Sequence, residues 1–326
     1  MDTGAEEIIF DEKGRCNFCG DAEVEFNKLK VETFHFPQSK GEYDCLIGLS
    51  GGVDSSYTLH LAMQMGLKPL CFTVDNGWNN PLADENIMKI VETLKVPFYR
   101  YTIDLKKFKK LQSAFMSMGQ KNLEIPTDHI LMATTYEMAD KYNIKLILSG
   151  GNVATESIMP ASWGYNARDL VHIKDVYKKA TGEKLTGLPT CSLLKWNYYR
   201  WVKKIKIWYP LDTITYNKEE AIKTLQEEYG YAPYPEKHEE SYFTAWFQNY
   251  YLFEKFGIDK RKAHYSSLIA SGQMTRKEAM RKLEACPVYP ELGIEKRVMK
   301  YKPRPYTDFK TDNYNLIAKI VKLCGY

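Results

Sequence analysis

The sequence predicts an α/β fold in which parallel strands alternate with helices, and two features of its first half indicate this. Short, nearly continuous apolar runs alternate with amphipathic stretches between about residues 43 and 152. Buried parallel strands have this apolar character because helices cover both faces of their sheet. Several of these runs also end in polar, glycine-rich turns, and ligands bind at the carboxyl ends of such strands.

The pattern then changes along the chain. Strands are expected over residues 43–50, 68–77, 98–104 and 144–152. Helices are expected over residues 55–65, 83–96, 105–120 and 128–143, and again over 216–230, 240–272 and 275–285. After about residue 160 strand patterns fade. We therefore predict an N-terminal segment over residues 1–40, a Rossmann-like domain over 41–160 and a mainly helical domain over 161–326.

Composition excludes several classes of protein. The 326 residues can bury a sizeable core, and the net charge of +4 is spread too thinly to indicate nucleic-acid binding. The basic runs at 105–110 and 200–206 fit solvated helix faces better than phosphate contacts. No apolar stretch is long enough for a membrane span, and the first residues do not resemble a signal peptide. We expect a cytoplasmic protein that binds neither membranes nor nucleic acid.

The cysteines indicate a reducing compartment. Their number, seven, is odd and low for this length, which argues against a disulfide scaffold. Cys16 and Cys19 form the string "CNFCG", which is half of a zinc-knuckle pattern. Two thiolates do not close a tetrahedral Zn²⁺ site. Either the start of the chain is truncated, or other residues complete the site, or no Zn²⁺ is bound there.

The string "SGGVDSS" at residues 50–56 joins the first predicted strand to a helix. The N-terminus of a helix offers unpaired N–H groups and the positive end of the dipole, which together suit phosphate. Gly51 and Gly52 let the backbone approach an anion, and Ser50, Ser55 and Ser56 add hydroxyl donors. The string is neither a Walker motif nor a dinucleotide fingerprint.

Asp54 is the unexpected residue in this turn. A carboxylate beside a phosphate repels it unless a cation lies between them, so Asp54 indicates Mg²⁺ bridging pyrophosphate oxygens. The same residue could serve only to cap the helix.

From Leu49 onward the string "LSGGVDSS" resembles the PP-loop of the ATP pyrophosphatase families, which include GMP, NAD, asparagine and argininosuccinate synthetases and tRNA-thiolating enzymes. Members share an adenine nucleotide alpha hydrolase-like fold. They adenylate a carbonyl oxygen with ATP, and a nitrogen or sulfur nucleophile then displaces AMP. The resemblance implies that ATP is bound by Leu49, Ser50, Gly51, Gly52, Asp54, Ser55 and Ser56, with Mg²⁺ at Asp54.

Three further segments, at the N-terminus, at 208–222 and at 234–276, resemble the N-acetyl sugar amidotransferase family. The family includes enzymes of lipopolysaccharide O-antigen and flagellin glycan synthesis, which convert an acetamido group of a sugar to an acetamidino group. The resemblance implies a nucleotide-linked N-acetyl sugar as substrate. It also implies a separate glutaminase subunit (HisH-like, with a HisF-like partner) that supplies ammonia, because no glutaminase motif is found in the chain.

Other strand ends add residues to the expected site. Asp75 and Asn76 lie at the end of the second strand and are placed for the nucleoside. Gly150 and Gly151 follow the fourth strand and face the same cleft, with Thr155 and Glu156 just beyond.

The helical domain adds charged residues. In "EKHEESYFT", Lys237 is expected to neutralise phosphate charge, and Glu239 or Glu240 to bind metal or accept a proton; a solvated helix start would explain the same string. We assign the catalytic roles to Asp54, Lys237 and Glu240. Lys260 and Arg261, followed by Lys262, are expected near phosphates.

Two other functions remain open at this stage. One is a tRNA-modifying PP-loop thiolase or ligase, which would use Cys16, Cys19 or Cys191 for sulfur and need a basic RNA-binding face. The other is a non-catalytic ATP-binding sensor on the same fold, which would need neither a metal site at Asp54 nor a second charged cluster.

Overall fold

The computed structural model describes residues 1–29, 41–234 and 239–312. Its centre is a parallel sheet of five strands in the order β3-β2-β1-β4-β5. The strands are β1 (Cys45–Gly48), β2 (Pro69–Asp75), β3 (Phe98–Thr102), β4 (Leu146–Leu148) and β5 (Lys206–Trp208). The predicted α/β class with a Rossmann-like parallel sheet is therefore confirmed.

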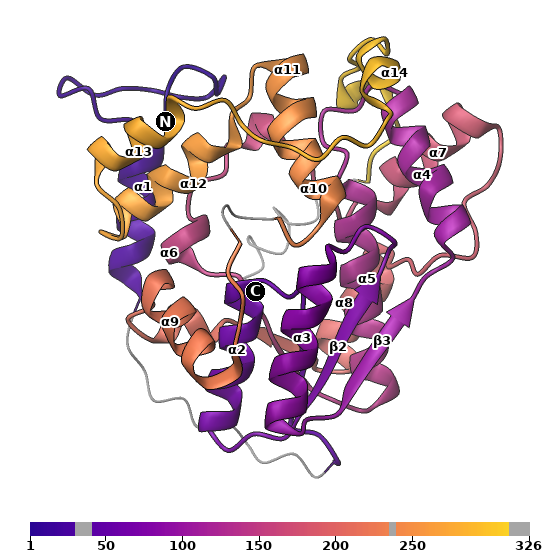
Figure 1. The fold of residues 1–326 in the computed structure, drawn as a ribbon. Helices are drawn as coiled ribbons and strands as arrows, with labels where there is room; N and C mark the ends of the chain where they lie inside the picture. The colour runs from indigo at the N-terminus through magenta and orange to yellow at the C-terminus, as the bar shows by residue number, and fades with distance from the viewer. Residues whose placement is uncertain (30–40, 235–238, 313–326) are drawn as a thin grey trace.

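Helices follow the strands in the first half and dominate the second (Figure 1). In the first half they are α1 (Asn17–Lys28), α2 (Val53–Gln64), α3 (Pro81–Leu94), α4 (Leu105–Ser117), α5 (Ile125–Lys141) and α6 (Val153–Glu156). In the second half they are α7 (Leu170–Thr181), α8 (Leu193–Asn197), α9 (Lys218–Tyr229), α10 (Tyr242–Trp246), α11 (Leu252–Phe256), α12 (Lys260–Ala270), α13 (Arg276–Leu283) and α14 (Glu295–Met299). Short 3₁₀ or π turns are η1 (Ala161–Trp163), η2 (Tyr198–Val202), η3 (Pro210–Thr213), η4 (Phe247–Tyr251) and η5 (Tyr306–Asp308).

The sheet separates two apolar cores. Successive side chains of a strand point to opposite faces, so Ile47 joins one core and Leu46 the other. The first core contains apolar residues of α2, α3 and α9, and the second contains those of α4, α5 and α7. Strand order reverses between β1 and β4, which is the switch point where doubly wound sheets bind ligands.

The edge strand β5 differs from the prediction, which expected no strand after residue 160. It lies within the stretch that contains the basic run 200–206, and it pairs in parallel with β4 through Ile207 and its neighbours. Lys206 and Ile207 are exposed, as is common for an edge strand that carries lysine. Because the strand is short and only partly covered, it lacks the apolar run that reveals a buried strand.

The C-terminal helices lie across the carboxyl end of the sheet. In Figure 1 the arrows of β2 and β3 point toward the upper part of the molecule, and α10 to α13 lie across that part. The first residues of the chain hold α12 in place, because the Met1 amino group donates to Ser266 Oγ at 2.7 Å and Lys262 forms an ion pair with Asp2. Residues of the strand ends and of these helices therefore line the same cavities.

Among the described residues, none of the helices combines the length and the apolar character that crossing a bilayer requires.

Candidate active site

The turn between β1 and α2 is held in place by a neighbouring backbone. Gly51 has φ +82°, a conformation that favours glycine, and a Cβ at this position would lie 2.5 Å from the Ala83 carbonyl oxygen. Gly52 precedes α2, and no side chain caps the helix there. The N–H groups of the first turn of α2 are therefore not satisfied by a side-chain cap, as an anion site requires.

The serines of this turn take different positions. The Ser50 and Ser55 hydroxyls lie 3.2 Å apart, and Ser55 Oγ also donates to the Gly52 carbonyl at 3.2 Å. Ser56 is buried in the first turn of α2, and its hydroxyl has no hydrogen-bond partner among the described residues. Ser50 and Ser55 line the cavities described below, whereas Ser56 does not.

The turn after β4 touches the same helix end. A Cβ on Gly150 would lie 2.8 Å from the Ser55 nitrogen, and a Cβ on Gly151 would meet the Tyr209 ring at 3.4 Å. The two glycine-rich strand ends predicted from the sequence are thus in contact at the switch point of the sheet. A side chain at position 150 would block this approach, so the contact depends on glycine there.

Two cavities meet above the turn. The first, which we call the inner cavity, has a volume of about 680 Å³ and lies over the ends of β1 and β2 and beside α5. The second, the outer cavity, has a volume of about 940 Å³ and extends from the first turn of α2 to α12 and α13. The residues that line both cavities are Ser50, Thr155, Glu156, Glu240, Gln248, Lys260 and His264. A ligand in either cavity therefore borders the same charged junction.

Asp54 lines the outer cavity and has a buried partner. The Tyr216 hydroxyl donates to Asp54 Oδ1, and burial together with the Asp54 charge raises the pKa of Tyr216, so the hydroxyl keeps its proton. The Tyr231 hydroxyl is also buried near Asp54 and has no hydrogen-bond partner among the described residues. The Asp54 carboxylate thus accepts a hydrogen bond from one tyrosine hydroxyl and lies near a second.

The residues at the junction fit Mg²⁺. This ion usually binds proteins through one or two carboxylates and keeps water and substrate phosphates as its other ligands. Asp54 and Glu156 are the carboxylates that would hold it, and the orphaned Tyr231 hydroxyl could donate to its ligands. The described residues contain no group of three or more His, Cys, Asp or Glu that could cage a metal by themselves, so phosphates would have to complete the shell.

Glu240 lies closer to the junction than its neighbour. A Cβ on Gly52 would lie 3.4 Å from Glu240 Oε1. Glu240 lines both cavities, while Glu239 lines only the outer one. Lys237, the other expected residue of this string, lies outside the described residues.

Asp75 and Asn76, at the end of β2, also differ in whether they line a cavity. Asn76 lines the inner cavity and accepts a hydrogen bond from the Trp78 nitrogen at 3.1 Å. Asp75 instead accepts from the Gly77 nitrogen at 3.0 Å and lines neither cavity. Asn76 is thus placed to meet a ligand, and Asp75 is placed to shape the turn.

The basic residues of α12 have separate surroundings. Lys260 lines both cavities and lies 2.8 Å from Met159 Sδ. Arg261 forms an ion pair with Asp259 at 2.7 Å and donates to the Ala285 carbonyl at 2.8 Å, which joins α12 to the chain after α13. Of these residues Lys260 lies nearest the junction, while Arg261 holds the wall of the outer cavity together.

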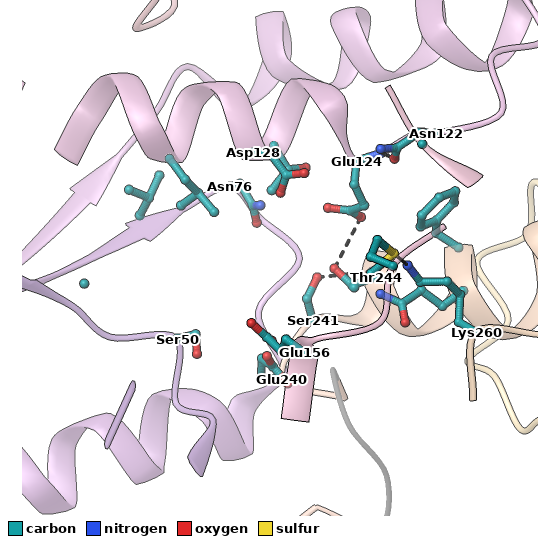
Figure 2. A pocket seen from close by; sticks show the side chains of 18 of the residues that line it. Ser50, Asn76, Asn122, Glu124, Asp128, Glu156, Glu240, Ser241, Thr244 and Lys260 are labelled. Atoms are coloured by element: carbon teal, nitrogen blue, oxygen red, sulfur yellow. Dashed lines mark hydrogen bonds between the residues drawn. The ribbon is translucent and has the colours of Figure 1, made fainter. Parts of the chain in front are cut away.

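Two acidic residues of the inner cavity were not singled out from the sequence. Glu124 and Asp128 lie at the start of α5, and Figure 2 shows them beside Asn122 and Asn76. Burial and the neighbouring Asp128 charge raise the pKa of Glu124 to about 8, and burial raises the pKa of Asp128 to about 6. Acidic residues are common in the first turn of a helix, so their presence there was no signal.

The cysteine pair near the N-terminus stands without further metal ligands grouped around it among the described residues. Cys16 Sγ and Cys19 Sγ lie 3.3 Å apart, and burial raises the pKa of Cys19 to about 11. Zinc needs thiolates and further ligands. No third ligand is grouped with the pair in the part of the chain that the structure describes. Zinc binding at this pair is therefore not supported.

The fold and the PP-loop define an ATP-dependent ligase of the PP-loop class. Residues 27–190, half of the chain, match the family model described as NAD synthase, so the chain belongs to that family. Residues 240–321 match the model described as LPS biosynthesis protein WbpG-like, C-terminal domain. Together the two matches confirm the resemblance to an amidotransferase family of lipopolysaccharide biosynthesis.

Several solved structures are similar to the chain. NMN synthetase from Francisella tularensis is 14% identical with a TM-score of 0.42, and the match covers 89% of this chain and 98% of that one. An NH3-dependent NAD synthetase from Campylobacter jejuni is 17% identical with a TM-score of 0.29, over 42% and 55% of the two chains. A predicted subunit of a tRNA methyltransferase from Methanocaldococcus jannaschii is 16% identical with a TM-score of 0.33, over 56% and 76%. No curated protein matches the chain.

Proposed function

We propose that the protein is the synthetase subunit of an ATP-dependent N-acetyl sugar amidotransferase. It converts an acetamido group of a bacterial nucleotide-linked sugar to an acetamidino group and releases AMP and pyrophosphate. The observation that carries this proposal is the junction of the two cavities at the PP-loop. A nucleoside in the inner cavity and a sugar in the outer cavity, beside the WbpG-like domain, would meet there.

The chemistry requires activation of a poor electrophile. The acetamide oxygen attacks the α-phosphate of ATP, pyrophosphate leaves, and an O-adenylate forms. Ammonia then adds to the carbon, and the C–O bond breaks to release AMP, which carries the former amide oxygen. Most of the rate acceleration in such a reaction comes from positioning and charge stabilisation. Residues at a junction of two cavities suit that task.

Several residues at and beside the junction have roles in this proposal. The N–H groups of the first turn of α2 and the hydroxyls of Ser50 and Ser55 hold the pyrophosphate. Mg²⁺ at Asp54 would supply charge neutralisation on that leaving group. Glu240 is placed to accept a proton near the reacting carbon, and Lys237 and Lys260 neutralise phosphate charge.

The proposal divides the chain between two tasks. Residues 41–160 hold ATP, and residues 161–326 hold the sugar, although β5 adds a strand to the sheet from the second part. A separate glutaminase subunit supplies ammonia. We place the reaction in the cytoplasm, where ATP is available.

The test uses the purified chain with ATP, Mg²⁺, ammonium and nucleotide-linked diacetamido sugars. We expect AMP, pyrophosphate and a product lighter by about one mass unit, because NH replaces O at the positioned carbon. Glutamine without a partner subunit should give no product. Turnover of glutamine by the single chain would refute the two-subunit arrangement. AMP release only with tRNA and a sulfur donor would refute the sugar substrate.

A further inference from the structure

The start of α5 brings a pair of carboxyl groups to the inner cavity. Glu124 occupies the N-cap position of α5, but its side chain makes no capping hydrogen bond. Its Oε1 instead accepts a hydrogen bond from Thr244 Oγ1 at 3.3 Å (Figure 2). Asp128 lies four residues later on the same helix face and lines the same cavity. Both carboxyl groups therefore serve the cavity rather than the helix.

A row of carboxylates leads from this pair to the PP-loop. The charge of Asp128 acts on Glu124, and so does the charge of Glu240, whose Oε1 would lie 3.4 Å from a Cβ on Gly52. The other titratable or charged groups that line the cavity, among the described residues, are Glu156 on α6, Tyr165, and His264 and Lys260 on α12. Lys260 acts on Asp128, and four acidic side chains line the cavity with it, of which Glu124 has its pKa raised to about 8 by burial and by the Asp128 charge. The space between them thus favours a small cation.

Asn76 provides independent evidence that this space is built for a ligand. Its side chain is only 8% exposed, and its Oδ1 accepts from Trp78, but its Nδ2 has no hydrogen-bond partner among the described residues. Figure 2 shows Asn76 and Asp128 on the same side of the cavity that Glu124 lines. A nearly buried amide donor that opens into a cavity needs an acceptor, such as an oxygen of an adenylated substrate.

The hydrogen-bonding groups around Glu124 and Asp128 suit ammonium. Ammonium donates hydrogen bonds and can be held by two carboxylates and a hydroxyl such as that of Thr244. It is also the cation that the proposed reaction consumes.

We infer that Glu124 and Asp128 bind the ammonium ion and remove one proton from it before it attacks the adenylate, whereas Glu240 accepts the proton that the nitrogen loses after it has added to the carbon. This inference rests on the proposed function. An N–H bond of ammonium breaks, and its proton passes to a carboxylate oxygen of Glu124. The freed electron pair of nitrogen forms the C–N bond, and the C–O bond electrons leave with AMP. The proton then passes from Glu124 to solvent.

The environment of the pair suits this proton transfer. The pKa of an alkylammonium such as lysine is about 10.4 and that of an ordinary glutamate about 4.3, a gap of about six units. Burial and the Asp128 charge raise the pKa of Glu124 to about 8 and narrow that gap. A general base works best when its pKa lies near the working pH.

The experiment compares two nucleophiles in Glu124→Gln and Asp128→Asn. Ammonium must lose a proton before it attacks, whereas hydroxylamine is uncharged at neutral pH. We expect kcat/KM for ammonium to fall by about 10²- to 10⁴-fold in Glu124→Gln, while hydroxylamine turnover stays within severalfold of wild type. Asp128→Asn should mainly raise the KM for ammonium. Glu92→Gln, at an exposed position of α3, is the matched control and should change neither.

Three results would overturn the inference. They are a parallel loss with both nucleophiles, a rise in KM for the sugar alone, and wild-type kinetics in both variants. A thermal melt of each variant identifies misfolding, and Glu124→Asp, which keeps the carboxylate, should recover part of the ammonium rate. If wild type forms no amidine from any acetamido sugar, the proposed function fails. If wild type is active and the variants match it, only the ammonium site fails.

Discussion

The PP-loop and the wall that faces it, formed by residues 239–312, are built by different means. The PP-loop is one short stretch whose backbone meets the phosphates, and neighbouring backbones hold it closely at Gly51 and Gly150. The facing wall presents side chains from α10 and α12, which act together with α5 and α6. The comparison teaches that recognition of ATP is a local property of the chain, whereas recognition of the acceptor depends on assembly of distant segments. The second can change while the first is kept.

The largest effect on turnover is expected from Asp54→Asn, which tests the PP-loop side of this comparison. The substitution keeps an oxygen that can accept from Tyr216, so the fold should persist, but it removes the charge that would hold Mg²⁺. We expect AMP and pyrophosphate formation to fall by about 10³-fold or more. Asp21→Asn, at an exposed position of α1, should leave turnover unchanged. Near-normal turnover in a folded Asp54→Asn protein would contradict a metal role for this residue.

A smaller effect is expected from Gly150→Ala, which tests the backbone contact. The new Cβ would lie 2.8 Å from the Ser55 nitrogen and 2.9 Å from the Asp54 carbonyl carbon, so the β4 turn must shift. We expect a loss of about 1–3 kcal/mol of stability together with weaker ATP binding. Calorimetry with a non-hydrolysable ATP analogue and thermal melts would measure both.

Gly20→Ala is the control for that change. No atom lies within 4 Å of a Cβ at this position in α1, so it should not destabilise the protein. Equal ATP affinity in Gly150→Ala and wild type would show that the close approach of the two strand ends is not needed.

The smallest expected effect is on the pH dependence of stability, and it comes from Glu124, which lies at the start of α5 and accepts a hydrogen bond from Thr244 of the facing wall. Burial raises the pKa of Glu124 from 4.5 to about 8, so the folded state holds a proton that the unfolded state releases. The resulting stability is complete below pH 4.5 and is lost as the pH rises toward 8. Between pH 6.5 and 8 the melting temperature of wild type should therefore fall more steeply than that of Glu124→Gln.

The window avoids the opposite contribution of His172. Burial lowers the pKa of His172 to about 4, so its contribution is lost only as the pH falls below 6.5. Equal slopes for wild type and Glu124→Gln between pH 6.5 and 8 would show that Glu124 titrates normally in the folded protein.

The sequence predicted well those elements that are formed by residues close together in the chain. The strands β1 and β2 and the helices that follow them lie within a few residues of their predicted ranges, because each is a continuous apolar or amphipathic stretch. The edge strand β5 was missed because Lys206 and Ile207 are exposed and leave no buried run. A hydrophobic pattern reveals a strand only where its residues are buried. The strand β5 has three residues and is partly exposed, so its sequence shows no such pattern.

The site shows the same limit. Residue types and strand ends brought the PP-loop and Asn76 to one place, and both line the cavities. Glu124 and Asp128 were not separable from ordinary acidic residues of a first helical turn, because Thr244 and Glu240 reach them from more than a hundred positions away. Arg261 and Lys260 are adjacent in the chain, yet Arg261 contacts Asp259 and Ala285 whereas Lys260 contacts Met159 and lines both cavities, which the sequence pattern does not show.

The tight seating of the PP-loop has a consequence for the kinetics of nucleotide binding. Gly51 lies against the backbone of Ala83 and Gly150 against that of Asp54 and Ser55, so the loop has little room to collapse or reorient. Its N–H groups therefore keep one direction whether or not phosphate is present. A site that needs no reordering loses little conformational entropy when its ligand arrives. Association with the nucleotide should then be governed by diffusion and charge, with no slow isomerisation of the loop on the path to the complex.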